Sequence, residues 1–128
     1  METFLNFNLS LKLHRIGIKT VSGFYYQKSG RDKVVYASKD IFTGMSDFDN
    51  VYVPAYLSSD LDHALPAEIE LKDSVYNLTV RKTKLKYDVR YEDPKGSIIY
   101  REYSASPAEA RARVILFLEK KNLLKNEN

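Results

Sequence analysis

The sequence predicts an α+β domain, mostly β: a small antiparallel sheet, curved or closed into a barrel, with one C-terminal helix packed on it. Three observations favour this class. Apolar and polar residues alternate in several short segments, turn residues separate those segments, and residues 106–122 show helical spacing behind an N-cap serine. The 128 residues suit a single domain, 1–128, and we expect its tail, 125–128, to fray.

Composition excludes several classes of protein. The chain is 44% hydrophobic and 29% charged, which is too apolar for a disordered segment. It contains no run of 18 apolar residues, so we expect no membrane-spanning helix. It contains no cysteine, which excludes disulfides, thiolate metal sites and cysteine nucleophiles. The N-terminal segment lacks the pattern of a secretory signal, and we expect a cytoplasmic protein.

In the first half of the chain we predict four short strands separated by loops. Residues 5–13 alternate strictly between apolar and polar side chains, which is typical of a strand with one buried face. A second strand over 16–27, with a bulge at Gly23, forms a hairpin with 34–37. A loop over 39–50 leads to a short strand, 51–53, which Pro54 confines to a sheet edge or a strand end.

The next segments predict one helical turn and three further strands. Ser59 and Asp60 cap a helical turn inside a second loop, 58–66, and a strand at 69–71 turns at 73–74. Residues 75–92 are rich in strand formers, but the apolar positions change parity along this segment. A bulge or tight turn within 81–84 restores a single buried face. Asp93-Pro94-Lys95-Gly96 then forms a turn into a strand over 97–103.

The C-terminal helix has the clearest signals. Ser106 is a good N-cap, Pro107 suits the first helical position, and Glu109 completes a capping box. Apolar residues follow at helical spacing, so we expect this helix to cover one face of the sheet. If the sheet closes, the pattern is OB-like, resembling a five-stranded oligonucleotide-binding barrel, although that fold usually has a helix where this chain predicts a loop.

Charge is distributed unevenly along the chain. Residues 40–73 carry eight acids against Lys72, a net charge of −7, whereas 1–39 and 74–128 each carry +5. The densest basic cluster consists of Arg81, Lys82, Lys84, Lys86 and Arg90. If this segment were one extended strand, Lys82, Lys84, Lys86 and Arg90 would share a face. Residues two apart on that face would lie about 7 Å from each other. That spacing is close to the phosphate spacing of a stretched single strand.

We therefore expect a small nucleic-acid-binding accessory protein that favours single-stranded DNA. The basic cluster would contact phosphates, and bases would stack on Tyr26, Tyr36 and Tyr100. Lysines on an exposed strand face also keep a sheet edge soluble, so plain solvation is the competing interpretation.

The alternative function is a protein-interaction module, an inhibitor or adaptor of the kind that phage and other mobile-element genomes encode. Its acidic loops, 40–66, would meet a basic partner through Asp47, Asp49, Asp60 and Asp62. Exposed strand edges could also pair with a second chain, giving a homodimer.

No pattern in the chain indicates an enzyme. The sequence contains no nucleophile elbow, phosphate-binding loop, dinucleotide-binding motif or zinc-protease motif. The two histidines, His14 and His63, lie far apart in the sequence, and we predict no metal and no cofactor.

Overall fold

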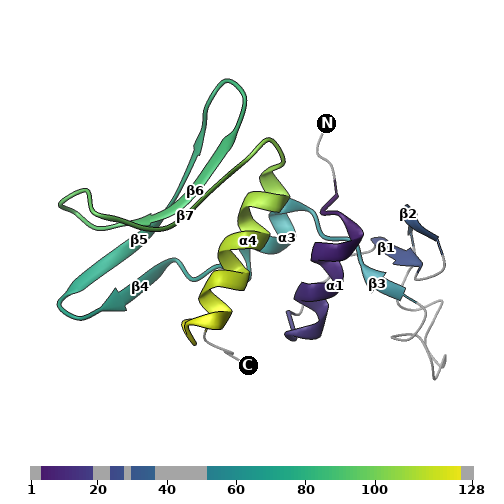
Figure 1. Cartoon of the computed structure of the whole chain (residues 1–128), viewed down its shortest axis with the longest axis horizontal. Coiled ribbons are helices and arrows are strands. Elements are labelled where there is room, and N and C mark those ends of the chain that lie inside the picture. The colour runs from purple at the N-terminus through teal and green to yellow at the C-terminus, as the bar shows by residue number, and fades with distance from the viewer. Residues whose placement is uncertain (1–3, 19–23, 28–29, 37–51, 125–128) are drawn as a thin grey trace.

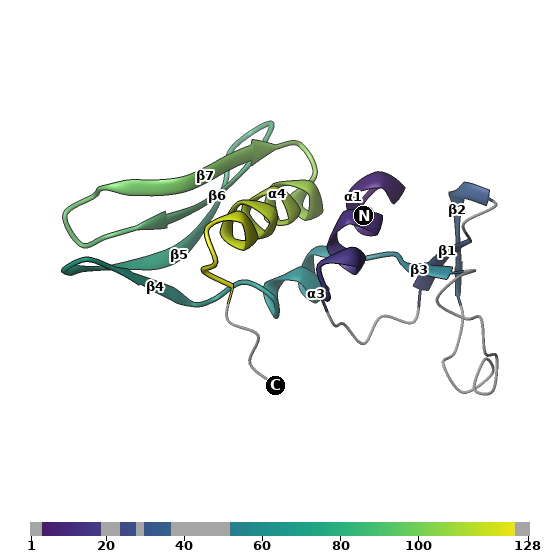
Figure 2. The same cartoon turned by 60° about the horizontal axis from the view of Figure 1, so that its bottom comes forward.

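The computed structural model describes residues 4–18, 24–27, 30–36 and 52–124. The fold is α+β and mostly strands. Figures 1 and 2 show a four-stranded sheet at one end of the molecule and a three-stranded sheet at the other, with the helices between them. The larger sheet is a curled half-barrel on which the C-terminal helix packs, which confirms the predicted fold class.

The predicted first strand is wrong, because residues 7–15 form a helix, α1 (Phe7–Arg15). The Asn6 side chain caps it by accepting a hydrogen bond from the Leu9 backbone N–H at 2.9 Å. The alternating apolar residues make two stripes on this helix. Leu9, Leu13 and Ile16 pack on the main core, and Phe4, Phe7 and Leu11 pack on a second cluster beside the small sheet. A helix buried on two sides thus produces the same alternation as a strand.

The small sheet contains β1 (Phe24–Gln27), β2 (Gly30–Tyr36) and β3 (Tyr52–Pro54), in the order β2-β1-β3. The antiparallel β1–β2 pair confirms the predicted hairpin, and β3 is an edge strand as expected. The predicted strand over 16–27 is too long. Residues 16 and 17 form a turn after α1, and residue 18 is not part of a strand. The predicted bulge at Gly23 and the predicted loop at 39–50 lie outside the described residues.

A short helix, α3 (Ser58–Asp62), connects the small sheet to the large one. Asp60 Oδ2 accepts a hydrogen bond from the Leu57 backbone N–H at 2.9 Å. The predicted helical turn is therefore confirmed, with Asp60 satisfying an otherwise unpaired N–H at its start.

The large sheet contains β4 (Glu68–Leu71), β5 (Ser74–Lys82), β6 (Tyr87–Glu92) and β7 (Ile98–Ser104). Its order is β4-β5-β6-β7, all antiparallel, so β4 and β7 are its edges and it is a curved sheet, not a closed barrel. The predicted break in the long β segment is present, slightly later than expected, at residues 83–86. The predicted turn at 93–96 is also present, and Gly96 adopts the φ of +91° that favours glycine there.

The helix α4 (Pro107–Lys120) begins as predicted, with Ser106 Oγ accepting a hydrogen bond from the Glu109 N–H at 3.1 Å. Its buried face includes Ala110, Val114 and Leu118, and it contacts β6, β7, α3 and α1. Val89 and Tyr91 of β6 lie in the same core and are fully buried. The helix therefore covers one face of the sheet and leaves the side chains that alternate with Val89 and Tyr91 on the opposite face.

Candidate nucleic-acid interface

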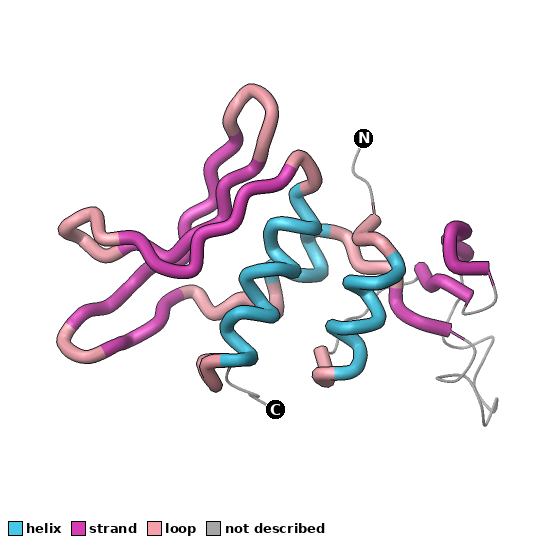
Figure 3. The backbone as a smooth tube through the Cα atoms, in the orientation of Figure 1, coloured by secondary structure: helices cyan, strands magenta, loops and turns pink. Residues whose placement is uncertain are grey.

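The most basic part of the described structure is the hairpin made by β5 and β6. The two strands pair from Asn77 opposite Glu92 to Lys82 opposite Tyr87, and the turn 83–86 joins them. Figures 1 and 3 show this turn projecting from the body of the molecule, away from the helices. We call residues 81–86 the hairpin tip.

The hairpin tip carries four cations and no carboxylate. Arg81, Lys82, Lys84 and Lys86 are all exposed, and the sequence has no Asp or Glu between Ser74 and Tyr87. Within the described residues, none of the four forms an ion pair, although the Lys82 ammonium lies 5.7 Å from the centre of the Tyr87 ring. These charges are therefore available to an anionic ligand.

The prediction that Arg90 continues this basic face is wrong. Its side chain is only 6% exposed and lies between the carboxylates of Asp88, at 3.4 Å, and Glu92, at 3.1 Å. The turn at 83–86 separates Lys84 and Lys86 from the strand, so the sequence run is not one extended ribbon. Arg90 is neutralised within the sheet and is not placed to contact a phosphate.

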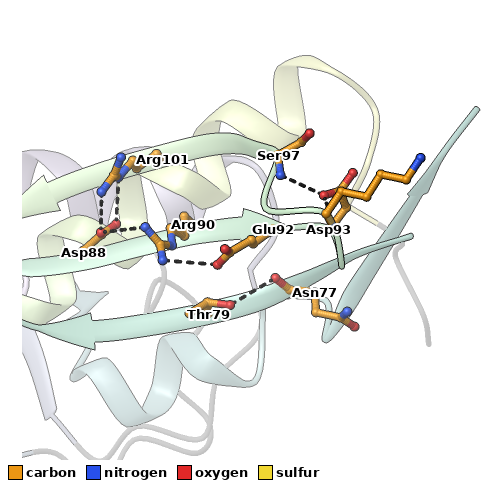
Figure 4. A network of polar contacts seen from close by, with 9 residues as sticks. Asn77, Thr79, Asp88, Arg90, Glu92, Asp93, Ser97 and Arg101 are labelled. Atoms are coloured by element: carbon orange, nitrogen blue, oxygen red, sulfur yellow. Dashed lines mark hydrogen bonds and ion pairs between the residues drawn. The ribbon is translucent and has the colours of Figure 1, made fainter. Parts of the chain in front are cut away.

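Asp88 also binds an arginine from the neighbouring strand. Arg101 Nη2 donates to Asp88 Oδ2 at 2.9 Å, and Arg101 Nε donates to Oδ1 at 3.3 Å. This hydrogen bond raises the pKa of Arg101, which stays charged. Figure 4 shows Asp88 between the two guanidinium groups on the face of the sheet away from α4. The Arg90 Nε–H is the one buried side-chain polar group among the described residues without a hydrogen-bond partner.

Two of the three predicted stacking tyrosines are not exposed platforms. Tyr26 is 6% exposed and its hydroxyl donates to the Leu5 carbonyl at 2.7 Å, and burial raises its pKa. The Tyr100 ring is partly buried on the main core, 6.0 Å from the Phe117 ring. Tyr36 ends β2, but its side chain lies outside the description.

A different tyrosine lies near the hairpin tip. Tyr103 is 47% exposed and pairs with Asp88 across β6 and β7, so it lies on the face of the sheet opposite α4. The Arg101 guanidinium lies 4.6 Å from its ring centre. Sequence alternation placed Tyr103 near a strand, but only the strand register shows that it lies on this face.

The acidic residues of the alternative hypothesis are separated by their structural roles. Asp62 Oδ1 accepts a hydrogen bond at 2.6 Å from Arg111 of α4, and Asp60 caps α3. Both carboxylates therefore hold parts of this chain together. Asp47 and Asp49 lie outside the described residues.

Leu85 lies at the apex of the hairpin tip and is strongly exposed. In sequence it shares parity with the buried residues Val89 and Tyr91, yet its side chain is 83% exposed. The reason is the same turn, which places Leu85 beyond the end of both strands. A leucine between two lysines in a turn was the signal that could have marked this position.

In the described part of the chain, no three His, Cys, Asp or Glu side chains form a group that could hold a metal ion. No helix there is long and apolar enough to cross a membrane. Comparison with known proteins finds no matching family, no matching curated protein and no matching solved structure.

Proposed function

We propose that this protein binds nucleic acid through the hairpin tip. The observation that carries the proposal is the group of four exposed cations on the projecting hairpin tip, residues 81–86, which contains no carboxylate. Phosphates of a nucleic acid are the natural partners of such a group. Each contact releases a condensed counterion, so binding is driven by entropy and weakens as salt rises.

The cations lie on both faces of the hairpin. A nucleic-acid backbone could therefore contact positive charge on either side of the tip. Arg81 pairs with Asp88 in the strand register and lies on the face opposite α4, whereas Lys82 pairs with Tyr87 and lies on the face toward α4. Lys84 and Lys86 lie in the turn that joins the two strands. This arrangement supports contact with phosphates on two sides of the tip.

The support is stronger for phosphate contact than for base stacking. Tyr26 is buried and Tyr100 is partly buried on the main core, so among the stacking candidates whose side chains are described only Tyr103 supports the single-strand preference expected from the sequence. A two-stranded β-ribbon also fits the major groove of duplex DNA. The proposal therefore covers both forms of DNA, and their relative affinity is part of the test.

The test measures binding to a labelled duplex and to its single strand at several salt concentrations. Substituting Lys84 and Lys86 with glutamine removes two tip charges and should weaken binding to both ligands. The matched control removes the exposed charges of Lys120 and Lys121, at the end of α4. Equal weakening in both double variants would show only a general charge effect, and the tip would then have no special role.

The second proposal is the protein-interaction module. It is supported by the open edge of the large sheet at β4, where Glu68 and Glu70 are exposed and could flank an added strand from a basic partner. A partner captured from cell extract should persist after nuclease treatment and should be lost when Glu68 and Glu70 become lysine. Nuclease-sensitive capture would favour the first proposal.

A further inference from the structure

The apex of the hairpin tip presents a leucine to solvent. Leu85 is 83% exposed, the largest exposed fraction among the large apolar side chains of the described residues. A single exposed leucine is common on protein surfaces and by itself indicates nothing. Its position, between two lysines at the end of a projecting hairpin, gives it a specific geometry.

The turn that carries Leu85 is closed by three hydrogen bonds. The Thr83 N–H donates to the Lys86 carbonyl at 2.8 Å, and the Thr83 hydroxyl donates to the same carbonyl at 2.9 Å. The Lys86 N–H in turn donates to Thr83 Oγ1 at 3.1 Å. Leu85 is therefore held on an ordered turn, and binding would cost little further ordering of the backbone.

The cations around Leu85 match the surroundings of a DNA groove. A groove has a row of phosphates along each side and base edges at its floor. On the hairpin tip, Arg81 and Lys82 lie on opposite faces and Lys84 and Lys86 flank the apex. Phosphate contacts on both sides would direct the apolar apex toward the bases.

We propose that Leu85 is an apolar wedge that enters between neighbouring base pairs of duplex DNA and bends the duplex. This inference rests on the proposed function, because the four cations must first hold the tip in a groove. Apolar side chains inserted at base steps partly unstack them and kink the helix axis. Pyrimidine–purine steps such as TA resist this least, so we expect the wedge to favour them.

An anionic lipid surface is the competing ligand for a basic tip with an apolar apex. It presents its charge in one plane, whereas the cations here lie on both faces of the hairpin. The turn also offers one large apolar side chain, not a cluster. Both features favour the duplex.

The test measures end-to-end distance by energy transfer in a duplex of about 25 base pairs with a central TA step. The wild-type protein should raise the transfer efficiency. Leu85→Ser should bind at low salt with an affinity within about threefold of wild type, because the phosphate contacts remain, but should leave the transfer efficiency near that of free DNA. The Lys84→Gln/Lys86→Gln variant should bind more weakly and, at a protein concentration that saturates the duplex with wild type, should bend a correspondingly smaller fraction of it. Because Leu85 is exposed, thermal unfolding of Leu85→Ser should match wild type.

Each other outcome overturns a defined part of the proposal. If Leu85→Ser bends the duplex as wild type does, the wedge is wrong while the proposed function stands. If the wild-type protein binds neither the duplex nor the single strand at low salt, both the proposed function and the wedge are wrong. If it binds phosphatidylserine vesicles in a Leu85-dependent way and does not bind DNA, the apex is a membrane contact.

Discussion

Replacing Asp88 by asparagine tests whether the ion network on the face of the sheet opposite α4 stabilises the fold. The Asp88 side chain is 4% exposed, and its Oδ2 lies 2.9 Å from Arg101 Nη2 and 3.4 Å from Arg90 Nη1. Asparagine keeps the shape but removes the charge, and its amide nitrogen is a donor that faces guanidinium donors. The buried Arg90 guanidinium then keeps one carboxylate partner, Glu92, at 3.1 Å.

The expected loss follows from the burial of the pair. Removing one partner of a buried ion pair costs about 3–5 kcal/mol. The lower end applies here, because Glu92 still pairs with Arg90 and because Arg101, whose side chain is 38% exposed, can turn to water. For 128 residues, an unfolding entropy of about 2.1 cal/mol/K per residue turns a loss of about 3 kcal/mol into a fall in Tm of about 11 °C.

Urea and thermal unfolding, followed by circular dichroism, measure this loss. The matched control is Glu70→Gln, which removes an exposed carboxylate from the same sheet and should change the free energy of unfolding by less than about 0.5 kcal/mol. If Asp88→Asn unfolds within about 1 kcal/mol of wild type, the network contributes little and the reasoning from burial is refuted.

Three further predictions concern the packing around the site. Tyr26→Phe removes the hydrogen bond to the Leu5 carbonyl and should lower the free energy of unfolding by about 1 kcal/mol, without changing nucleic-acid affinity. Ser104→Ala should raise the pKa of Glu109 toward its ordinary value, because the hydrogen bond from Ser104 lowers it, and a carboxyl NMR titration measures this. Leu118→Ala should cost about 3 kcal/mol in urea unfolding, because Leu118 is fully buried under the sheet.

The pH dependence of stability has a definite sign for Glu109. Its pKa is lowered in the folded state, so its contribution is fully present above its ordinary pKa and is lost as the pH falls through the lowered value. Ser104→Ala should therefore show less acid-induced loss of stability than wild type. An unchanged Glu109 pKa in that variant would contradict the hydrogen bond from Ser104. A drop in DNA affinity in Tyr26→Phe would contradict the conclusion that Tyr26 is not a stacking platform.

Local signals predicted the C-terminal half of the fold well. The N-cap of α4, the turn at 93–96 and the parity change near residue 83 each depend on neighbouring residues, and each feature is present. The N-terminal helix was missed because its apolar residues pack in two separate hydrophobic clusters. Alternation alone does not distinguish that case from a strand, although Asn6 before the segment and Gly17 after it were helix-end signals.

The candidate site was less predictable because one of its expected cations, Arg90, is paired with carboxylates of the sheet. Arg90 looked like its lysine neighbours, and its neutralisation depends on Asp88 and Glu92 lying along the same strand face with Arg101 arriving from β7. Nothing in the sequence indicates that Tyr26 is unavailable for stacking. Its burial depends on the fold, which places the Leu5 carbonyl beside its hydroxyl. The exposure of Lys84 and Lys86 follows from the turn, which extends beyond the ends of both strands, whereas Arg81 and Lys82 are exposed at the end of β5.

The salt dependence of duplex binding tests the central claim most directly. If each of the four tip cations contacts one phosphate, the logarithm of the association constant should fall against the logarithm of salt concentration with a slope of about −3.6. Lys84→Gln/Lys86→Gln should reduce the slope to about −1.8. A slope near zero, or one that the double substitution leaves unchanged, would contradict binding through the hairpin tip.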